Sequence, residues 1–157
     1  MNSNHHDKHT PPEDAGNPSN SQRPTNPREP DADFGPVIHA YTRKQALADG
    51  FQVDVSETAK EAGFRIPVFM MSTVFEGYVK VPEGVQYQDE RGRLWDLLWM
   101  LYVAIKQDHH AQDRLSFQLY VRNDNSKAKL ITLLSVCGPL DIDDASPSVT
   151  VMMHGEG

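Results

Sequence analysis

Two groups of side chains in this sequence are of types that bind metal ions. His109 and His110 are adjacent, and adjacent side chains on a helix or a strand point in different directions, so these two do not easily share one ion. The segment DIDD, which starts at Asp141, offers carboxylates for a cation. It lacks the glycine and the distal glutamate of a calcium-binding loop, so we expect a solvated turn there and no metal site.

Cys137 is the only cysteine, so a disulfide within the chain and a cysteine-based zinc site are both excluded. It stands in a segment of Leu and Val, where we expect a small core residue and not a nucleophile. The sequence has no glycine-rich phosphate loop, nucleophile elbow or zinc signature. This pattern favours a protein that is not an enzyme and that has no cofactor.

One segment suggests an alternative. HAYTRKQALADGF, residues 39–51, resembles the opening strand and helix of ADP-ribosyltransferase-type folds. In those folds a His or Arg strand and an aromatic residue hold nicotinamide adenine dinucleotide, so the resemblance implies a site at His39, Tyr41 and Arg43 in a small nucleotide-using enzyme. Those folds also use a glutamate on a late strand, and the late strand-like segments here contain none. In the other interpretation His39 is a partly buried strand residue that is hydrogen-bonded to a neighbouring carbonyl or carboxylate.

Nucleic-acid binding is not expected. Ala59 and Gly63 in SETAKEAGF have the spacing of a helix-turn-helix, but the following segment, IPVFMMSTVF, has no Arg, Lys, Asn or Gln to contact bases or phosphates. The net charge is -7, and every short basic cluster has acidic residues nearby. Long-range attraction to phosphate backbones is therefore absent.

The first 33 residues differ in composition from the rest. They contain many Pro, Asn and Ser residues, and no aromatic or branched aliphatic residue. Such a segment buries too little apolar surface to offset its ordering entropy, so we expect residues 1–33 to be disordered, with His5, His6 and His9 solvated. Residues 34–157 then form a single domain, as their length allows.

Short elements alternate at the start of this domain. We expect a strand at residues 37–41, followed by a helix that begins with a capping box of Thr42 and Gln45 and ends at Gly50. Residues 51–55 alternate in polarity like a half-buried strand. Ser56 is expected to cap a second helix that ends at Gly63, and Pro67 argues against an ordinary central strand in the apolar segment that follows.

The strongest structural signal is QDERGRLWDLLWMLYVAIKQDHH, residues 88–110. Acidic residues at its start and Lys106 near its end favour a helix. It has two apolar stripes at helical spacing: Leu94, Leu98, Leu101 and Ile105 form one, and Trp95, Trp99 and Tyr102 form the other. We therefore expect a central helix that is buried over most of its circumference.

Asp96 interrupts the apolar circumference of this helix. Arg93, three positions earlier, is placed to pair with it at the surface. If that face is buried, the carboxylate needs internal donors instead and becomes a polar anchor. Structural and functional roles for Asp96 both remain open from the sequence.

The last third of the chain changes to the two-residue period of strands. LSFQLYVR, KLITLLSVC and SVTVMM each have strand character, and turn residues NDNS follow the first. We expect a three-stranded antiparallel meander packed on the central Trp-rich helix, with short strand and helix elements before it. The fold class is therefore α+β.

The chain lacks the features of a secreted or membrane protein. Its start has neither the apolar region of a secretory signal nor the Arg-rich character of a transit peptide. The longest apolar run, residues 97–105, is well short of the roughly 20 residues that a membrane span needs. We expect a cytoplasmic protein with no membrane partner.

The ordered blocks VIHAYTRKQALADGFQVDVSETAKEAGFRIPV, YQDERGRLWDLLWM, LSFQLY and VCGP resemble a family of small uncharacterised proteins carried on bacterial plasmids and integrative conjugative elements. The resemblance spans nearly all of residues 37–153 and departs at the long N-terminal tail and at Phe75, where the family often has Trp. It implies a bacterial cytoplasmic setting and an accessory role on a mobile element. We expect a protein that binds another protein, such as a host defence or replication factor, and the sequence leaves its oligomeric state open.

Overall fold

The computed structural model describes residues 41–110 and 112–156. In chain order the elements are α1 (Arg43–Ala48), β1 (Gln52–Asp54), α2 (Ser56–Glu61), β2 (Val68–Met71), α3 (Ser72–Val74), the π-helix η1 (Phe75–Val79), α4 (Glu90–Gln107), β3 (Arg114–Val121), β4 (Lys129–Asp141) and β5 (Asp144–Met153). The predicted disordered tail, most of the strand predicted at residues 37–41, and His39 lie outside the described residues.

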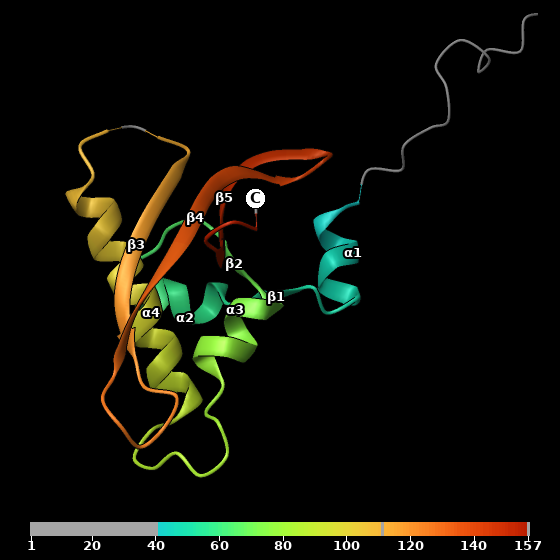
Figure 1. Ribbon diagram of the computed structural model, residues 1–157. Helices are drawn as coiled ribbons and strands as arrows, with labels where there is room; N and C mark the ends of the chain where they lie inside the picture. Colours follow the sequence, from blue (N-terminus) through green and yellow to red (C-terminus); the bar gives the residue numbers. More distant parts are fainter. Residues whose placement is uncertain (1–40, 111, 157) are drawn as a thin grey trace, which may run out of the picture. The chain divides into compact units, whose positions relative to one another are not determined.

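The strands form one mixed sheet in the order β1-β2-β5-β4-β3 (Figure 1). The last three strands pair antiparallel in sequence order, which confirms that part of the predicted meander. The sheet continues beyond them, because β5 also pairs parallel with β2, and β2 pairs antiparallel with β1. The protein is therefore α+β as predicted, with a five-stranded mixed sheet where a three-stranded sheet was expected.

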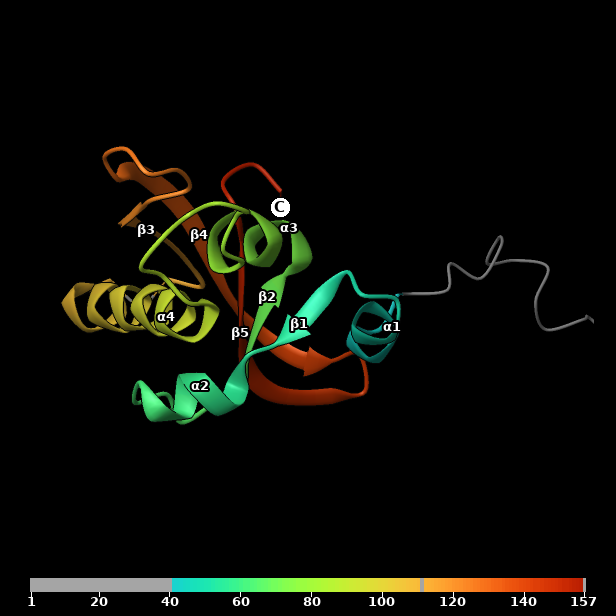
Figure 2. The ribbon, with the colours of Figure 1, turned by 90° about the horizontal axis from the view of Figure 1, so that it is seen from below.

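Helices lie on both faces of this sheet. Side chains of α2, η1 and α4 join alternate side chains of the strands in one apolar core, which includes Ala59, Val79, Leu97, Leu98, Leu101, Met70, Phe117, Leu133, Val149 and Val151. Arg43 of α1 instead contacts Phe69 and Thr150, whose positions alternate with the core residues and so face the opposite side. Figure 2 shows α1 far from α4, with the strands between them.

The local signals near the start of the domain are confirmed. Thr42 Oγ1 accepts a hydrogen bond from the Gln45 backbone N–H at 3.1 Å, and Gln45 Oε1 accepts from the Thr42 N–H at 2.9 Å. Gly50 and Gly63 follow the ends of α1 and α2 with φ of 76° and 108°, a region that glycine enters without penalty. Both helices therefore end where the sequence predicts.

Two predictions beside β2 are wrong. Ser56 does not cap α2: it is the first residue of that helix, and its hydroxyl accepts from the Val68 N–H and donates to the Val68 carbonyl. Pro67 does not exclude a central strand, since β2 starts one residue later and lies between β1 and β5. Proline is tolerated at the start of a strand, and the Pro67 carbonyl still accepts from the Val149 N–H at 2.9 Å.

α4 forms where predicted but is not buried on all sides. Asp89 caps it by accepting from the Gly92 N–H at 2.8 Å, and Leu97, Leu98 and Leu101 face the core. The second stripe lies outward, because Trp95 and Trp99 are 37% and 41% exposed. The prediction of a helix buried over most of its circumference is therefore wrong: among the described residues, α4 packs its Leu97, Leu98 and Leu101 side on the sheet and leaves Trp95 and Trp99 partly exposed.

Arg93 and Asp96 do not form the surface pair that their spacing suggested. Asp96 is exposed, while Arg93 is buried and turns away from it. The Arg93 guanidinium donates to the carbonyls of Tyr78 and Arg122 and to the side chains of Gln88 and Asn123. Burial away from any carboxylate partner lowers the pKa of Arg93. Arg93 therefore joins η1, the loop before α4 and the turn after β3.

Candidate functional site

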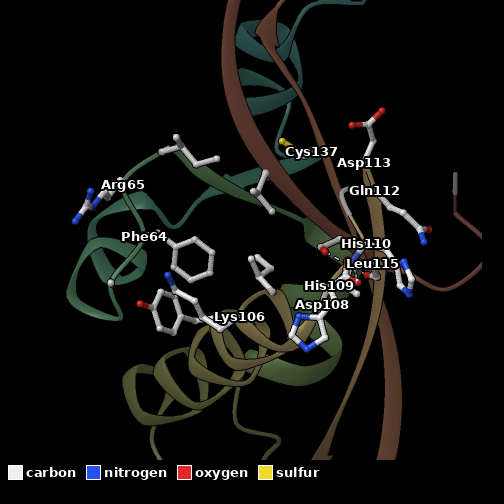
Figure 3. A pocket seen from close by; sticks show the side chains of 16 residues that line it. Phe64, Arg65, Lys106, Asp108, His109, His110, Gln112, Asp113, Leu115 and Cys137 are labelled. Carbon is white, nitrogen blue, oxygen red and sulfur yellow. Dashed lines mark hydrogen bonds between the residues drawn. The ribbon is translucent and has the colours of Figure 1, made fainter.

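A groove of about 820 Å³ lies at the C-terminal end of α4 (Figure 3). Its walls come from that helix end, the loop between α2 and β2, the residues before and at the start of β3, and the facing parts of β4 and β5. Five separate parts of the chain thus shape it. We call this hollow the groove.

The floor of the groove is apolar. It is formed by the side chains of Phe64, Ile66, Tyr102, Ile105, Leu115 and Val149. They belong to the α2–β2 loop, to α4 and to strands β3 and β5, and Phe64, Ile66 and Val149 also pack in the apolar core. An open apolar floor of this kind favours the docking of apolar groups.

Tyr102 is the best-fixed wall of the groove. Its ring meets Phe64 edge-on at 5.7 Å between centroids and stacks on Trp99 at 5.7 Å. Gly63 leaves room for this ring, since a Cβ added at that position would lie 3.2 Å from Tyr102 Cε2. The Tyr102 wall of the groove is therefore held in place by packing within the chain.

The rim of the groove carries charges of both signs. Lys106 lies 5.4 Å from the centre of the Tyr102 ring, and Asp108 and Asp113 lie nearby on the rim with Arg65. His109 and His110 also line the groove, and Figure 3 shows their rings pointing in different directions. In the described part of the chain no group of three or more His, Cys, Asp or Glu residues is placed to hold a metal ion.

Cys137 also lines the groove, and this corrects a prediction. The residue is exposed and does not belong to the core. It lies on the same face of β4 as the buried Leu133 and Ser135, because alternate residues of a strand share a face. Cys137 lines the open groove, so a position with core-like neighbours in sequence is exposed to solvent.

Residues 32–157 match the family described as "Family of unknown function (DUF6573)". The chain belongs to this family. Comparison with curated proteins and with solved structures finds no match. Every described residue of the groove, and every element of the sheet, lies within the part of the chain that matches DUF6573.

Of the enzyme site predicted for this DUF6573 chain, Tyr41 and Arg43 are described and His39 is not. Tyr41 and Arg43 line a second, smaller hollow of about 250 Å³ together with Asp141. The Tyr41 hydroxyl donates to Asp49 at 2.5 Å, and this hydrogen bond to a carboxylate raises the Tyr41 pKa to about 12. The nucleotide-using site stays a prediction.

Arg43 is engaged with its own chain. Its guanidinium donates to the Leu140 carbonyl at 2.6 Å, to Gln52 Oε1 at 2.8 Å and to Thr150 Oγ1 at 3.1 Å, and it lies 4.2 Å over the Phe69 ring. Burial lowers its pKa, and the nearby Asp141 carboxylate opposes that change. Arg43 therefore fastens α1 to the sheet.

The DIDD segment takes part in the same attachment. The Asp141 carboxylate accepts from the backbone N–H groups of Ile142, Arg43 and Lys44 at 2.8 to 3.1 Å, and these hydrogen bonds lower its pKa. We expected a solvated turn at DIDD. Ile142 and Asp143 are exposed, as expected, but Asp141 is partly buried. Sequence reasoning missed this contact because the two partners lie 98 positions apart.

In the described residues no helix combines the length and the apolar character that a membrane crossing requires.

Proposed function

We propose that this protein is an accessory protein of a bacterial plasmid or integrative conjugative element that acts in the cytoplasm by binding another protein in the groove. A host defence or replication factor is the kind of partner that this setting favours. The setting rests on the resemblance of the sequence blocks to proteins of mobile elements. The binding role rests on one observation, the solvent-open apolar floor of the groove.

The groove has the make-up of a protein-binding site. Interfaces combine an apolar centre that includes aromatic side chains with a polar rim, and the groove has Phe64 and Tyr102 in its floor and Lys106 and Asp113 at its rim. Apolar anchors of a partner gain most when they fill a pocket that is already formed. The packing of Tyr102 between Phe64 and Trp99 supplies such a pocket.

A protein partner fits the charges better than a nucleic acid does. The rim of the groove mixes Arg65 and Lys106 with Asp108 and Asp113, and the whole chain carries a net charge of -7. Nucleic-acid binding needs a surface with an excess of positive charge that displaces counterions. Mixed rim charges instead orient a partner that has both signs itself.

The test uses a matched pair of isoleucines. Ile105 lies in the groove and is 39% exposed, while Ile142 is 60% exposed in the turn between β4 and β5 and lies outside the groove. Tagged wild-type, Ile105→Glu and Ile142→Glu proteins are each used for a pull-down from a bacterial host. Thermal unfolding of the three purified proteins is compared first, to verify that both variants are folded. We expect one stoichiometric protein with the wild type and Ile142→Glu, and its loss with Ile105→Glu.

Two results would contradict the proposal. Recovery of no stoichiometric protein with the wild type removes the binding role. Equal recovery with Ile105→Glu places binding outside the groove. A chain that lacks residues 1–33 is tested in parallel, and its recovery of the same protein shows that the domain suffices.

A further inference from the structure

Among the described residues the sheet ends at two edge strands, β1 and β3, and only one of them is short. β1 has three residues, and a very short edge strand offers little to a further strand. β3 has eight residues, and its register with β4 runs from Arg114 to Val121 without a bulge. Proline, lysine and bulges often block an edge, and the β3 sequence RLSFQLYV has none of these. The outer edge of β3 is therefore open to another strand.

Alternate backbone groups of β3 point away from the sheet. The Cys137 N–H donates to the Asp113 carbonyl at 2.7 Å, and the register between β3 and β4 continues in step from this pair. Hydrogen-bonding direction alternates along an antiparallel strand, so the odd-numbered residues of β3 bond to β4. Ser116, Gln118 and Tyr120 then direct their backbone N–H and C=O groups outward, and within the described residues none of these groups has a hydrogen-bond partner. They form a row at the spacing that an extended polypeptide backbone matches.

A hollow of about 370 Å³ lies along this open edge, and we call it the edge hollow. It is lined on one side by Met100, Val103, Ala104 and Gln107 of α4, and on the other by Ser116, Phe117 and Gln118 of β3 with Thr132 of β4. It shares no lining residue with the groove. The side chains of an added strand alternate between its two faces, so every second one meets Met100 and Val103 in the edge hollow. The site therefore selects for apolar residues at alternate positions.

A second copy of this chain does not fit the edge. α4 packs on β3, the two elements lie side by side (Figure 1), and both are about 27 Å long, at 18 and eight residues. Two β3 strands related by a two-fold axis must pair antiparallel, because a parallel pair would place like groups opposite each other. Paired strands lie about 4.8 Å apart, and both copies of α4 would then lie over them on the same face of the joined sheet. Packed helices need about 8 to 10 Å between their axes, so the two helices would collide.

We propose that the open edge of β3 binds an extended segment of another protein, which joins the five-stranded sheet as a further strand. The segment has no helix of its own over this face, so α4 does not obstruct it. Its backbone hydrogen-bonds to Ser116, Gln118 and Tyr120, and its alternate apolar side chains enter the edge hollow against Met100 and Val103. In such strand addition the backbone bonds supply affinity and the alternate side chains supply specificity. The edge hollow and the groove are separate surfaces, so binding here does not require a partner in the groove.

The probe for this edge is a peptide of alternating valine and threonine, eight residues long, with two added lysines and blocked ends. Fluorescence anisotropy of the labelled peptide measures its binding to the full chain. We expect binding that is lost when one alternating set of residues is N-methylated and kept when the other set is, because only one set directs its N–H groups at β3. Absence of binding, or equal effects of the two methylations, contradicts strand addition.

Two substitutions at one position test the protein side of the contact. Gln118→Pro removes the outward N–H without removing a bond to β4, and an edge strand tolerates proline at such a position. Gln118→Ala keeps this N–H, and both variants lose the side-chain hydrogen bond to Thr132. We expect the dissociation constant of the peptide to rise about tenfold or more with Gln118→Pro and less than about threefold with Gln118→Ala. Equal weakening by both folded variants would contradict a backbone contact.

Amide hydrogen exchange of the wild-type chain, followed by NMR, tests the same edge without a variant. Without peptide, the N–H groups of Ser116, Gln118 and Tyr120 should exchange at least about tenfold faster than those of Phe117 and Leu119, which bond to β4. Bound peptide should slow the exchange of the first three. Unchanged exchange with bound peptide would place binding elsewhere, and slow exchange without peptide would mean that the chain itself or a second copy already covers the edge. Either result overturns the proposal.

Discussion

The buried guanidinium of Arg93 joins three parts of the chain that are distant in sequence. Its nitrogen atoms donate to the carbonyls of Tyr78 and Arg122 and to Gln88 and Asn123. The π-helical turn of η1 also directs the Gly77 carbonyl to Asn123, which donates to it at 2.8 Å. The fork of an arginine reaches all of these acceptors, whereas the three donors of a lysine radiate from one nitrogen.

Arg93→Lys should therefore lower the free energy of unfolding by about 2 to 4 kcal/mol, because buried acceptors lose their donors. Arg91→Lys is the matched control on the same helix. Arg91 pairs with Glu61 at 3.2 Å, and its side chain is 78% exposed, so the change should stay within about 0.5 kcal/mol. Urea unfolding measures the free energy of unfolding of both variants. A similar decrease for Arg93→Lys and Arg91→Lys would contradict the role of Arg93 as a buried link between segments.

The ends of helices α1 and α2 could be predicted from the sequence. The capping box at Thr42 and the glycines after α1 and α2 act within a few residues, so their effect is readable from neighbours in the chain. The orientation of α4 was not readable, because both of its stripes are apolar and periodicity does not say which one meets the sheet. Only the position of the sheet decides that Leu98 is buried and that Trp99 is not.

A glycine pair tests the link between a helix end and the groove. Gly63→Ala should cost about 2 to 3 kcal/mol, because the new Cβ requires both the strained φ of 108° and contact with Tyr102 at 3.2 Å. Gly50→Ala has only the strain, at φ 76° with no atom within 4 Å, and should cost about 1 to 2 kcal/mol. Thermal and urea unfolding of the two variants measure these stability costs. A smaller cost at Gly63 would show that Tyr102 is not a fixed wall.

At the scale of the whole molecule, α1 is held to the turn between β4 and β5 by Arg43 and Asp141. The hydrogen bonds that lower the Asp141 pKa stabilise the fold while this carboxylate is charged. That contribution is complete above the ordinary carboxyl pKa of 3.8 and is lost as the pH falls through the lowered value. Acid should therefore loosen this attachment.

The corresponding measurement compares the melting temperatures of wild type and Asp141→Asn as the pH falls. We expect the wild type to melt higher at neutral pH, and the difference to shrink below pH 3.8. Asp143→Asn, an exposed change in the same turn, serves as the control and should show a small difference throughout. A difference for Asp141→Asn that does not change with pH would mean that its charge does not hold α1.

The sequence by itself determined the α+β class, the places where most helices and strands begin and end, and the antiparallel pairing of the last three strands. Those features depend on caps, glycines, turns and alternation, which act over a few residues. Tertiary structure alone decided that β2 lies inside the sheet, that the Trp95–Trp99 stripe faces outward, that Cys137 is open and that a groove exists. Each of these depends on which distant segment covers a given surface, and a side chain's exposure is set by that neighbour and not by its own position in the chain.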